Sequence, residues 1–166
     1  YLSKYSGWYS VSDEAFYTED EITTENGKKI SKSSGSNVDW FEEESYFFKL
    51  SAWQNKLLNH YEKNPSFVSP KSRSNEIIQF VKGGLKDLSV SRTSFKWGIQ
   101  VPNNEKHIVY VWLDALTNYI SALNFPNTED SLYKNFWPAD IHVIGKDILR
   151  FHTVYWPAFL MAAKLP

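Results

Sequence analysis

The last third of the chain contains the same unit twice, a short run of consecutive apolar residues followed by a helix pattern. Residues 108–112 (Ile-Val-Tyr-Val-Trp) precede a helix predicted over 114–123, and residues 141–144 (Ile-His-Val-Ile) precede one predicted over 147–163. Strands that are apolar on both faces and that each lead into a helix are typical of a parallel sheet covered by helices. In such sheets ligands bind beyond the carboxyl ends of the strands, so the two strand-to-helix junctions are the candidate site.

The part of the chain before residue 108 divides into a β-rich segment and a helical segment. Short strands are predicted at residues 7–11, 15–18 and 38–41, with turns or loops at 12–14, 25–29 and 31–37. Helices are predicted from Ser45 or Ser51 to Lys63, where Asn64–Pro65 ends the first, and from Ser72 or Ser74 through Leu85. Two more strands are predicted at 90–95 and 97–101. The sequence therefore predicts a mixed α/β chain.

Composition favours a folded globular protein. Apolar residues make up 42% of the 166 residues and aromatic residues 17%. The aromatic content is explained either by a dense core or by flat surfaces that stack on a ligand. A net charge of −1 gives no overall footprint for nucleic acid or for an anionic membrane, although residues 51–166 carry thirteen Lys/Arg against nine Asp/Glu.

Several classes of site are excluded by residue type. The chain has no cysteine, which excludes disulfides, thiolate zinc ligands and a catalytic cysteine. The four histidines are scattered without metal-ligand spacing, so no metal site is predicted. No apolar run approaches the length of a membrane span, and residue 1 is tyrosine, so we expect the chain to be a piece of a longer protein.

The first strand-to-helix junction lies at residues 112–119. Trp112 is predicted to end the strand, and Asp114 is placed to cap the helix that follows. Tyr119 follows Ala115 by four residues, so both share one helix face near the strand end. One interpretation is a core tryptophan with a packed tyrosine. The other is an aromatic-walled pocket in which the small Ala115 leaves room for a ligand.

The second junction is Gly145–Lys146–Asp147. Glycine permits close backbone approach, and a helix N-terminus offers free N–H groups to an anionic or hydroxyl-rich ligand, although Asp147 serves equally well as a helix cap. In the helix that follows, Ile148, His152 and Trp156 recur every four residues and form one stripe. A histidine in such a stripe is either a hydrogen-bonded core residue or a group that contacts a ligand.

Segments from end to end of the chain stand out together: residues 7–9 (Gly-Trp-Tyr), 39–48, 85–92, 111–115, and 145–148 with Phe151–His152. Each segment is short, but their combination and order resemble the methionyl-tRNA synthetases, a family of class I aminoacyl-tRNA synthetases. The resemblance implies that residues 1–45 are the connective-peptide insertion. Residues 46–166 would then be the second half of a Rossmann-like catalytic domain built on a parallel sheet.

The resemblance also implies roles for individual residues. The methionine pocket would be lined by Trp112, Ala115, Tyr119, Ile148, His152 and Trp156. Gly145 and Asp147 would bind the ribose of ATP, and Arg92, the one candidate catalytic residue, would join a charged network linking the catalytic halves. The HIGH-type motif would precede residue 1, and the KMSKS loop and the anticodon-binding domain would follow residue 166.

The implied activity is ATP-dependent activation of L-methionine to methionyl-adenylate, followed by transfer to tRNA(Met). ATP with Mg²⁺, methionine and tRNA(Met) are the expected partners, with no membrane, and a monomer is favoured. The expected location is a bacterial-type cytoplasm or the mitochondrial matrix, and the fragment alone is expected to be inactive. Sulfur–ring contacts from Trp112, Tyr119 and Trp156, and the polar tips of Tyr119 and His152, are expected to recognise the thioether.

Two features require separate interpretation. Residues 29–33 (Lys-Ile-Ser-Lys-Ser) match the KMSKS-type loop, but they lie in a polar turn before the predicted sheet, so we interpret the match as coincidental and expect Lys32 to be dispensable. Many members of this family carry a C-x-x-C zinc knuckle where this chain has Ser10 and Asp13, so no zinc is expected. Packing of Trp8, Tyr9, Phe16 and Tyr17 would then hold the knuckle.

Two alternatives remain open. The first is a class I synthetase for leucine, isoleucine or valine, which the short connective segment argues against. The second is a catalytically inactive amino-acid- or tRNA-binding module that keeps the fold without the chemistry. Flanking sequence with both ATP-handling motifs would distinguish the enzyme from the binding module.

Overall fold

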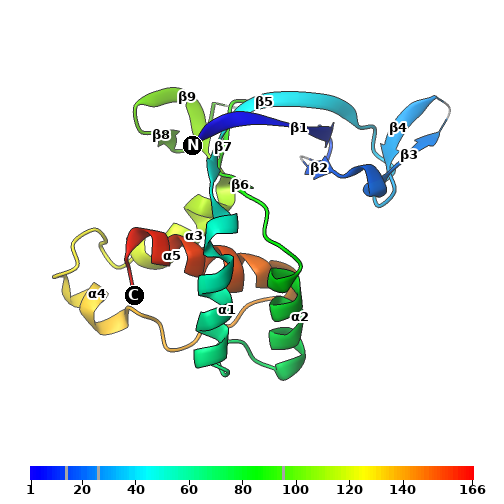
Figure 1. The fold of residues 1–166 in the computed structure, drawn as a ribbon. Helices are drawn as coiled ribbons and strands as arrows, with labels where there is room; N and C mark the ends of the chain where they lie inside the picture. The colour runs from blue at the N-terminus through cyan, green and yellow to red at the C-terminus, as the bar shows by residue number, and fades with distance from the viewer. Residues whose placement is uncertain (14, 26, 95) are drawn as a thin grey trace. The chain divides into compact units, whose positions relative to one another are not determined.

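The computed structural model describes residues 1–13, 15–25, 27–94 and 96–166 (Figure 1). The predictions for Glu14, Asn26 and Phe95, and for the side chain of Phe16, lie outside what it describes. The chain forms two compact units: residues 1–46 with 91–108, and residues 47–90 with 109–166. No helix within the described residues has both the length and the apolar character of a membrane span.

Long antiparallel strands form the first unit. β1 (Leu2–Ser10) pairs with β5 (Asp39–Phe48) from Leu2 opposite Tyr46 to Tyr9 opposite Asp39, and with β2 (Ala15–Tyr17) on its other side. The register places Trp8 opposite Trp40, whose rings meet edge to face with centroids 5.3 Å apart. Such cross-strand aromatic pairs fix the register of a ribbon that has little core of its own.

Smaller elements complete this unit. The 3₁₀ turn η1 (Glu19–Glu21) leads into a hairpin of β3 (Ile22–Glu25) and β4 (Lys28–Ser31). A second sheet has the order β7 (Ser91–Arg92), β9 (Asn104–Val109), β8 (Gln100–Val101). Gly98 precedes β8 with φ of 132°, and a Cβ there would lie 2.6 Å from the Ile108 side chain, so only glycine fits.

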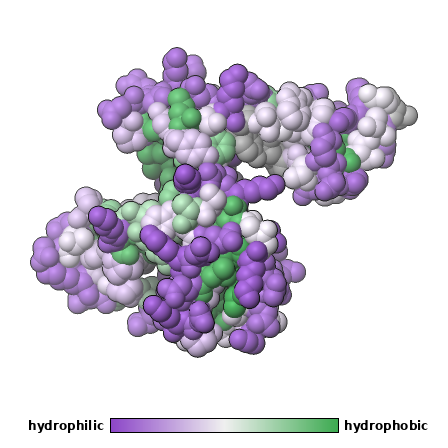
Figure 2. Space-filling model, in the orientation of Figure 1, coloured by the Kyte–Doolittle hydropathy of each residue, from purple (hydrophilic) through white to green (hydrophobic). Residues whose placement is uncertain are grey.

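Helices make up most of the second unit. In chain order they are η2 (Leu50–Trp53), α1 (Gln54–Lys63), α2 (Lys71–Lys82), α3 (Val111–Ser121), α4 (Ser131–Phe136), the 3₁₀ turn η3 (Lys146–Ile148), the π turn η4 (Phe151–Tyr155) and α5 (Trp156–Ala163). β6 (Leu88–Ser89) pairs with the last residues of β5. In the space-filling view, hydrophobic residues show between the hydrophilic side chains of these helices (Figure 2).

Two apolar clusters hold the helices together. In the first, α1, α2 and the C-terminal helix bury Leu57, Ile77, Val81, Val154 and Ala158 completely. The second joins α3, α4 and α5 through Leu116, Ile120, Tyr133, Trp137 and Trp156. Within the two helices predicted to end at Lys63 and Leu85, the buried residues are spaced three or four apart. Each fully buried leucine or isoleucine stabilises the fold by roughly 2–5 kcal/mol relative to alanine.

The predicted helix caps were wrong. Ser45 lies inside β5, and Ser51 lies in η2, where its backbone N–H and hydroxyl donate to the Asp87 carboxylate at 3.1 and 2.6 Å. Ser72 and Ser74 lie inside α2, whose first turn follows Pro70 instead. Proline fixes φ near the helical value and loses no hydrogen bond at a helix start, so it competes there with a serine cap.

The first predicted strand–helix boundary was displaced. β9 ends at Val109 and α3 begins at Val111, so Trp112 lies in the first helical turn and Asp114 does not cap the helix. The residue at the cap is Tyr110, whose backbone N–H donates to the Val90 carbonyl at 2.9 Å. A tertiary hydrogen bond therefore sets the boundary, where the apolar pattern alone continues the strand.

The second predicted strand, at 141–144, does not form within the described residues. Ile141 and Val143 are 79% and 94% exposed, and the pairings with a described register are all antiparallel. Likewise the strand predicted at 97–101 is reduced to Gln100–Val101. A strand is defined by its hydrogen-bonded neighbour, and an apolar run without one stays irregular. The mixed α/β class is nevertheless as predicted.

Candidate methionine site

Two helical segments of the second unit bring most of the predicted side chains together. α3 supplies Tyr119, and the segment after Gly145 supplies His152 and Trp156. The Tyr119 hydroxyl lies 2.8 Å from Nε2 of His152, with ring centroids 5.6 Å apart, and the Tyr119 and Trp156 rings lie 6.3 Å apart. The candidate site therefore contains a partly buried polar pair inside an aromatic cluster.

The hydrogen bonds of His152 define its tautomer. Nδ1 lies 2.9 Å from the carbonyl oxygen of Ile148, which can only accept, so Nδ1 carries the proton. Nε2 then accepts from the Tyr119 hydroxyl in the neutral imidazole. In this arrangement both protons are used within the protein, so the recognition of a thioether by these polar tips stays a prediction. What the pair presents to a ligand is the lone pairs of the Tyr119 oxygen.

More aromatic side chains surround this pair than the sequence predicted. Trp112 stacks on Phe151 with centroids 3.8 Å apart and planes 17° apart. His142 meets the Tyr119 ring edge-on at 4.7 Å, and partial burial lowers the pKa of His142. The sequence placed Phe151 in a helix and His142 in a strand and gave neither a ligand role. The only sequence feature that could have indicated such a role is that both flank the second junction, at residues 145–147.

The indole of Trp156 adds an unused donor. Trp156 is 5% exposed, and its Nε1 has no hydrogen-bond partner among the described residues. A buried unpaired N–H costs about 1–3 kcal/mol, and an acceptor on a ligand removes that cost.

The remaining predicted residues are more open. Ala115 is exposed on α3, and the Ile148 side chain is half-buried. No atom lies within 4 Å of a Cβ built on Gly145, which takes the cap position of η3, so Asp147 lies in the first turn and does not cap it. Asp147 lines a cavity of about 340 Å³ with Glu76, Lys146, Leu149, Arg150, Phe151 and Tyr155.

Phe151 links the two sets of predicted residues, because it lines this cavity and also stacks on Trp112. A second cavity, of about 360 Å³, has a nearly all-apolar lining, including Leu113, Ile120, Phe159 and Leu160. Of the predicted site residues it includes only Trp156. The polar pair and its rings, rather than either cavity, therefore form the candidate site.

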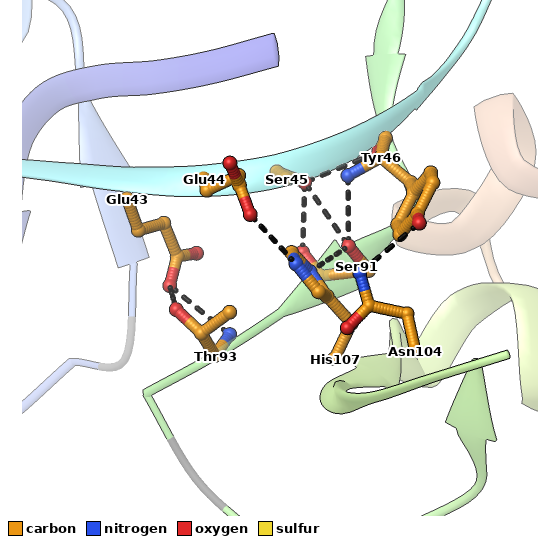
Figure 3. A network of polar contacts seen from close by, with 8 residues as sticks. All are labelled: Glu43, Glu44, Ser45, Tyr46, Ser91, Thr93, Asn104 and His107. Carbon is orange, nitrogen blue, oxygen red and sulfur yellow. Dashed lines mark hydrogen bonds and ion pairs between the residues drawn. The ribbon is translucent and has the colours of Figure 1, made fainter. Parts of the chain in front are cut away.

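Arg92 belongs to the other unit, on β7. Its Nε lies 3.6 Å from Oε1 of Glu43, which is almost fully buried, and its Nη1 donates to the Ser91 carbonyl at 2.8 Å. Thr93 donates to the same carboxylate through its N–H and hydroxyl, at 3.3 and 3.2 Å (Figure 3). Burying a carboxylate is costly unless it is paired in this way, so the contacts of Arg92 and Thr93 offset part of the cost of burying Glu43.

The same unit contains a serine–histidine–glutamate series that the sequence did not suggest (Figure 3). Nδ1 of His107 lies 3.0 Å from the Ser91 hydroxyl, and Nε2 lies 3.4 Å from Glu44. Ser91 is completely buried, and its oxygen accepts the Tyr46 backbone N–H at 2.9 Å. A substrate carbonyl cannot reach such a serine. The series therefore joins β5, β7 and β9 and is not a nucleophilic site.

Comparison with known proteins decides the family. The model of the family described as tRNA synthetases class I (M) matches residues 25–166. The chain belongs to this family. The methionine–tRNA ligases of Rickettsia felis and Mycobacterium tuberculosis H37Rv are 62% and 57% identical to it, over 100% and 99% of the chain. These alignments cover 31% and 32% of the relatives, so the chain spans about a third of their length.

Solved structures of this tRNA synthetase family agree. The chain resembles M. tuberculosis methionyl-tRNA synthetase bound by methionyl-adenylate, with a TM-score of 0.90, 56% identity, and coverage of 100% of this chain and 33% of that one. The free form of the same synthetase gives a TM-score of 0.89. The predicted resemblance and the mixed α/β class are both confirmed.

The KISKS segment of this synthetase chain serves the β3–β4 hairpin. Lys32 donates through its backbone N–H to Glu21 at 2.9 Å and through Nζ to the Asp20 carbonyl at 2.6 Å. The Ser31 hydroxyl accepts the backbone N–H groups of Ser33 and Ser34, each at 3.3 Å. The serine and lysine side chains are thus used to close a turn, which supports the coincidental interpretation.

We predict that Lys32→Ala in the whole protein leaves methionine-dependent ATP–pyrophosphate exchange within a few-fold of wild type. An exposed lysine whose ammonium group binds the Asp20 carbonyl in the η1 turn contributes little to catalysis. Steady-state kinetics of the variant provide the check. A hundredfold loss, about 2.7 kcal/mol of transition-state stabilisation, would show that Lys32 handles ATP.

A hydroxyl–carboxylate cluster occupies the positions of the zinc knuckle. Asp13 accepts hydrogen bonds from Ser34, Tyr17 and Ser36 at 2.5, 2.7 and 2.8 Å, and these bonds hold the pKa of its carboxyl below the usual value. The Ser10 hydroxyl accepts the Asp13 backbone N–H at 3.3 Å. Within the described residues no group of three potential metal ligands occurs. Hydrogen bonds therefore tie the two turns of this subdomain together.

Proposed function

We propose that this chain is the methionine-selecting part of a methionine–tRNA ligase. The observation that carries the proposal is the Tyr119–His152 hydrogen bond inside an aromatic cluster, at positions that the resemblance to methionyl-tRNA synthetases assigns to methionine. The reaction we infer for the whole protein is activation of L-methionine by ATP, with its Mg²⁺, and transfer of the methionyl group to tRNA(Met). Bacterial relatives support a cytoplasmic location, and the mitochondrial matrix is the alternative that we propose.

Selection of methionine follows from the chemistry of the cluster. Methionine differs from leucine mainly in a flexible, polarizable thioether, and an apolar pocket alone separates them by only about 1–3 kcal/mol. The rings of Trp112, Tyr119 and Trp156 add sulfur–aromatic contacts of roughly 0.3–1.5 kcal/mol. Ala115 and Ile148 form the small and apolar parts of the wall. His152 holds the Tyr119 ring in one orientation and thereby fixes the pocket shape.

ATP is inferred to bind beside the methionine residues. In the activation step a methionine carboxylate oxygen bonds to the α-phosphorus of ATP, and pyrophosphate leaves with the electron pair of the broken P–O bond. Gly145 and Asp147 are proposed to bind the ribose, because the backbone at Gly145 is open and the Asp147 carboxylate lines the adjoining cavity. Lys146 and Arg150 line the same cavity and offer cations to a polyphosphate, while Glu76 and Asp147 balance their charge.

The other inferred roles concern the first unit. We propose that residues 1–45 are the connective-peptide subdomain, held without zinc, and that residues 46–166 complete the catalytic domain. Contacts also group residues 91–108 with the connective segment. Arg92 is proposed to act through its pairing with Glu43 as part of a charged network, and not on the substrate itself. A monomeric parent protein that does not act at a membrane is the simplest expectation.

The test is ATP–pyrophosphate exchange by the whole protein, with L-methionine and L-leucine compared as substrates. We expect exchange with methionine and at least hundredfold lower kcat/KM with leucine, followed by charging of tRNA(Met) and no other tRNA. Methionine binding without exchange would identify the catalytically inactive module instead. Exchange that prefers leucine, isoleucine or valine would assign the chain to a different synthetase.

A further inference from the structure

The helix that carries His152 changes type in its middle. It begins as the 3₁₀ turn η3, widens to the π turn η4 and continues as α5. In the π turn the Trp156 backbone N–H donates to the carbonyl of Phe151, five residues back. π turns inside α-helices are rare and are concentrated at functional sites. The π turn at Phe151–Tyr155 therefore has a specific physical cause.

Pro157 is the first of two residues that explain the π turn. An α-helix would pair the N–H of residue 157 with the carbonyl of Thr153, but proline has no N–H and its ring clashes with that carbonyl. Thr153 and Pro157 are both buried, so water does not readily replace the missing donor. The Thr153 carbonyl therefore needs a donor from another element.

Tyr61 supplies that donor from α1. Its hydroxyl donates to the Thr153 carbonyl oxygen at 2.7 Å, and its side chain is 5% exposed within the first apolar cluster. Burial raises the pKa of the Tyr61 hydroxyl well above its usual value, so it remains a donor throughout the physiological range. A buried carbonyl left without this bond would destabilise the widened turn.

The widened turn determines where His152 points. His152 donates through Nδ1 to the Ile148 carbonyl at 2.9 Å, and Thr153 donates through its hydroxyl to the Leu149 carbonyl at 2.8 Å. These side-chain donors occupy carbonyls one turn back along the widened segment. From this position Nε2 of His152 reaches the Tyr119 hydroxyl on α3.

We propose that Tyr61 is a positioning residue of the methionine site: by binding the carbonyl that Pro157 cannot, it holds the π turn that aims His152 at Tyr119. The proposal rests on the proposed function. It assigns a specificity role to a residue that touches neither the candidate ligand pocket nor His152 itself. Tyr61 and Pro157 should therefore act as one unit in measurements of methionine affinity.

The experiment is steady-state exchange by the whole protein carrying Tyr61→Phe. We expect the KM for methionine to rise roughly tenfold, the loss expected for a buried carbonyl without a donor, with kcat and the KM for ATP within about twofold of wild type. The matched control is Tyr133→Phe, since the Tyr133 hydroxyl is buried with no partner among the described residues. Its methionine KM should not change.

Pro157→Ala supplies a second test that does not depend on the stability of Tyr61→Phe. Residue 157 then regains the N–H that can close an ordinary α turn on Thr153. We expect Pro157→Ala alone to raise the methionine KM several-fold without lowering the Tm, and Tyr61→Phe in that background to change it less than about threefold.

The results that would overturn the role of Tyr61 differ from the result that would overturn the proposed function. A lowered Tm with an unchanged methionine KM in Tyr61→Phe would make Tyr61 a packing residue and overturn the proposal. Additive effects of Tyr61→Phe and Pro157→Ala, or no KM change in Pro157→Ala, would overturn it as well. If the wild-type protein shows no methionine-dependent exchange at all, the proposed function fails first, and this result is distinguishable from the others.

Discussion

His152→Ala in the whole protein is expected to lower kcat/KM for methionine about a hundredfold, roughly 2.7 kcal/mol of transition-state stabilisation. The substitution removes the acceptor that holds the Tyr119 hydroxyl at 2.8 Å, so the ring that forms one wall of the pocket loses its fixed orientation. Tyr119 is only half-buried, and its freed hydroxyl can turn to water. The melting temperature should therefore fall by only a few degrees.

His107→Ala is the matched control. His107 is completely buried, whereas His152 is 9% exposed. The two ring nitrogens of His107 contact Ser91 and Glu44. Its loss should cost about 2–4 kcal/mol of stability and leave the methionine KM within twofold of wild type. If His152→Ala instead melts early and keeps its methionine KM and kcat, His152 is a core residue and the ligand role assigned to it is wrong.

The second large effect concerns the isolated 166-residue chain, which should show no methionine-dependent exchange above background. Positioning both reactants supplies about 7–11 kcal/mol of a typical rate enhancement, and we propose that this chain supplies only part of the ATP site. Gly145 and Asp147 are exposed, and the lysine–serine segment at 29–33 is used to close a hairpin.

A contaminating synthetase from the expression host could imitate activity, so the same chain carrying His152→Ala is the control. Exchange that is present in the wild-type chain and absent from this variant would contradict the prediction. Equal traces in both preparations would be assigned to the host enzyme. Circular dichroism of both chains shows whether each one is folded during the assay.

Much of the fold was predictable because local patterns and packing agree. The face of α3 that carries Ala115 and Tyr119 and the buried faces of α1 and α2 follow from residues three and four apart, and the structure keeps them. The family was predictable because short segments along the whole chain combine into one resemblance.

The missed features all depend on contacts distant in sequence. The apolar run at 141–144 looks like a strand, but no described strand pairs with it. Asp87 takes the hydrogen bonds of Ser51 that would otherwise mark a helix cap, and the bond from Tyr61 to Thr153 supports a π turn where the pattern indicates an uninterrupted helix. The pairing of His152 with Tyr119 depends on that turn. Helix and strand propensities depend on residues that are close in sequence, so they cannot predict these contacts.

The most direct test of the account is a titration of the whole protein with L-methionine, followed by the fluorescence of its tryptophans, in wild type and in Ala115→Leu. Ala115 is exposed on α3, and leucine is a good helix former, so the substitution fills space without disturbing the fold. If α3 and the His152 segment form the methionine pocket, wild type should show a saturable change. Ala115→Leu should then bind at least tenfold more weakly at an unchanged melting temperature. An unchanged dissociation constant in Ala115→Leu would show that methionine binds elsewhere.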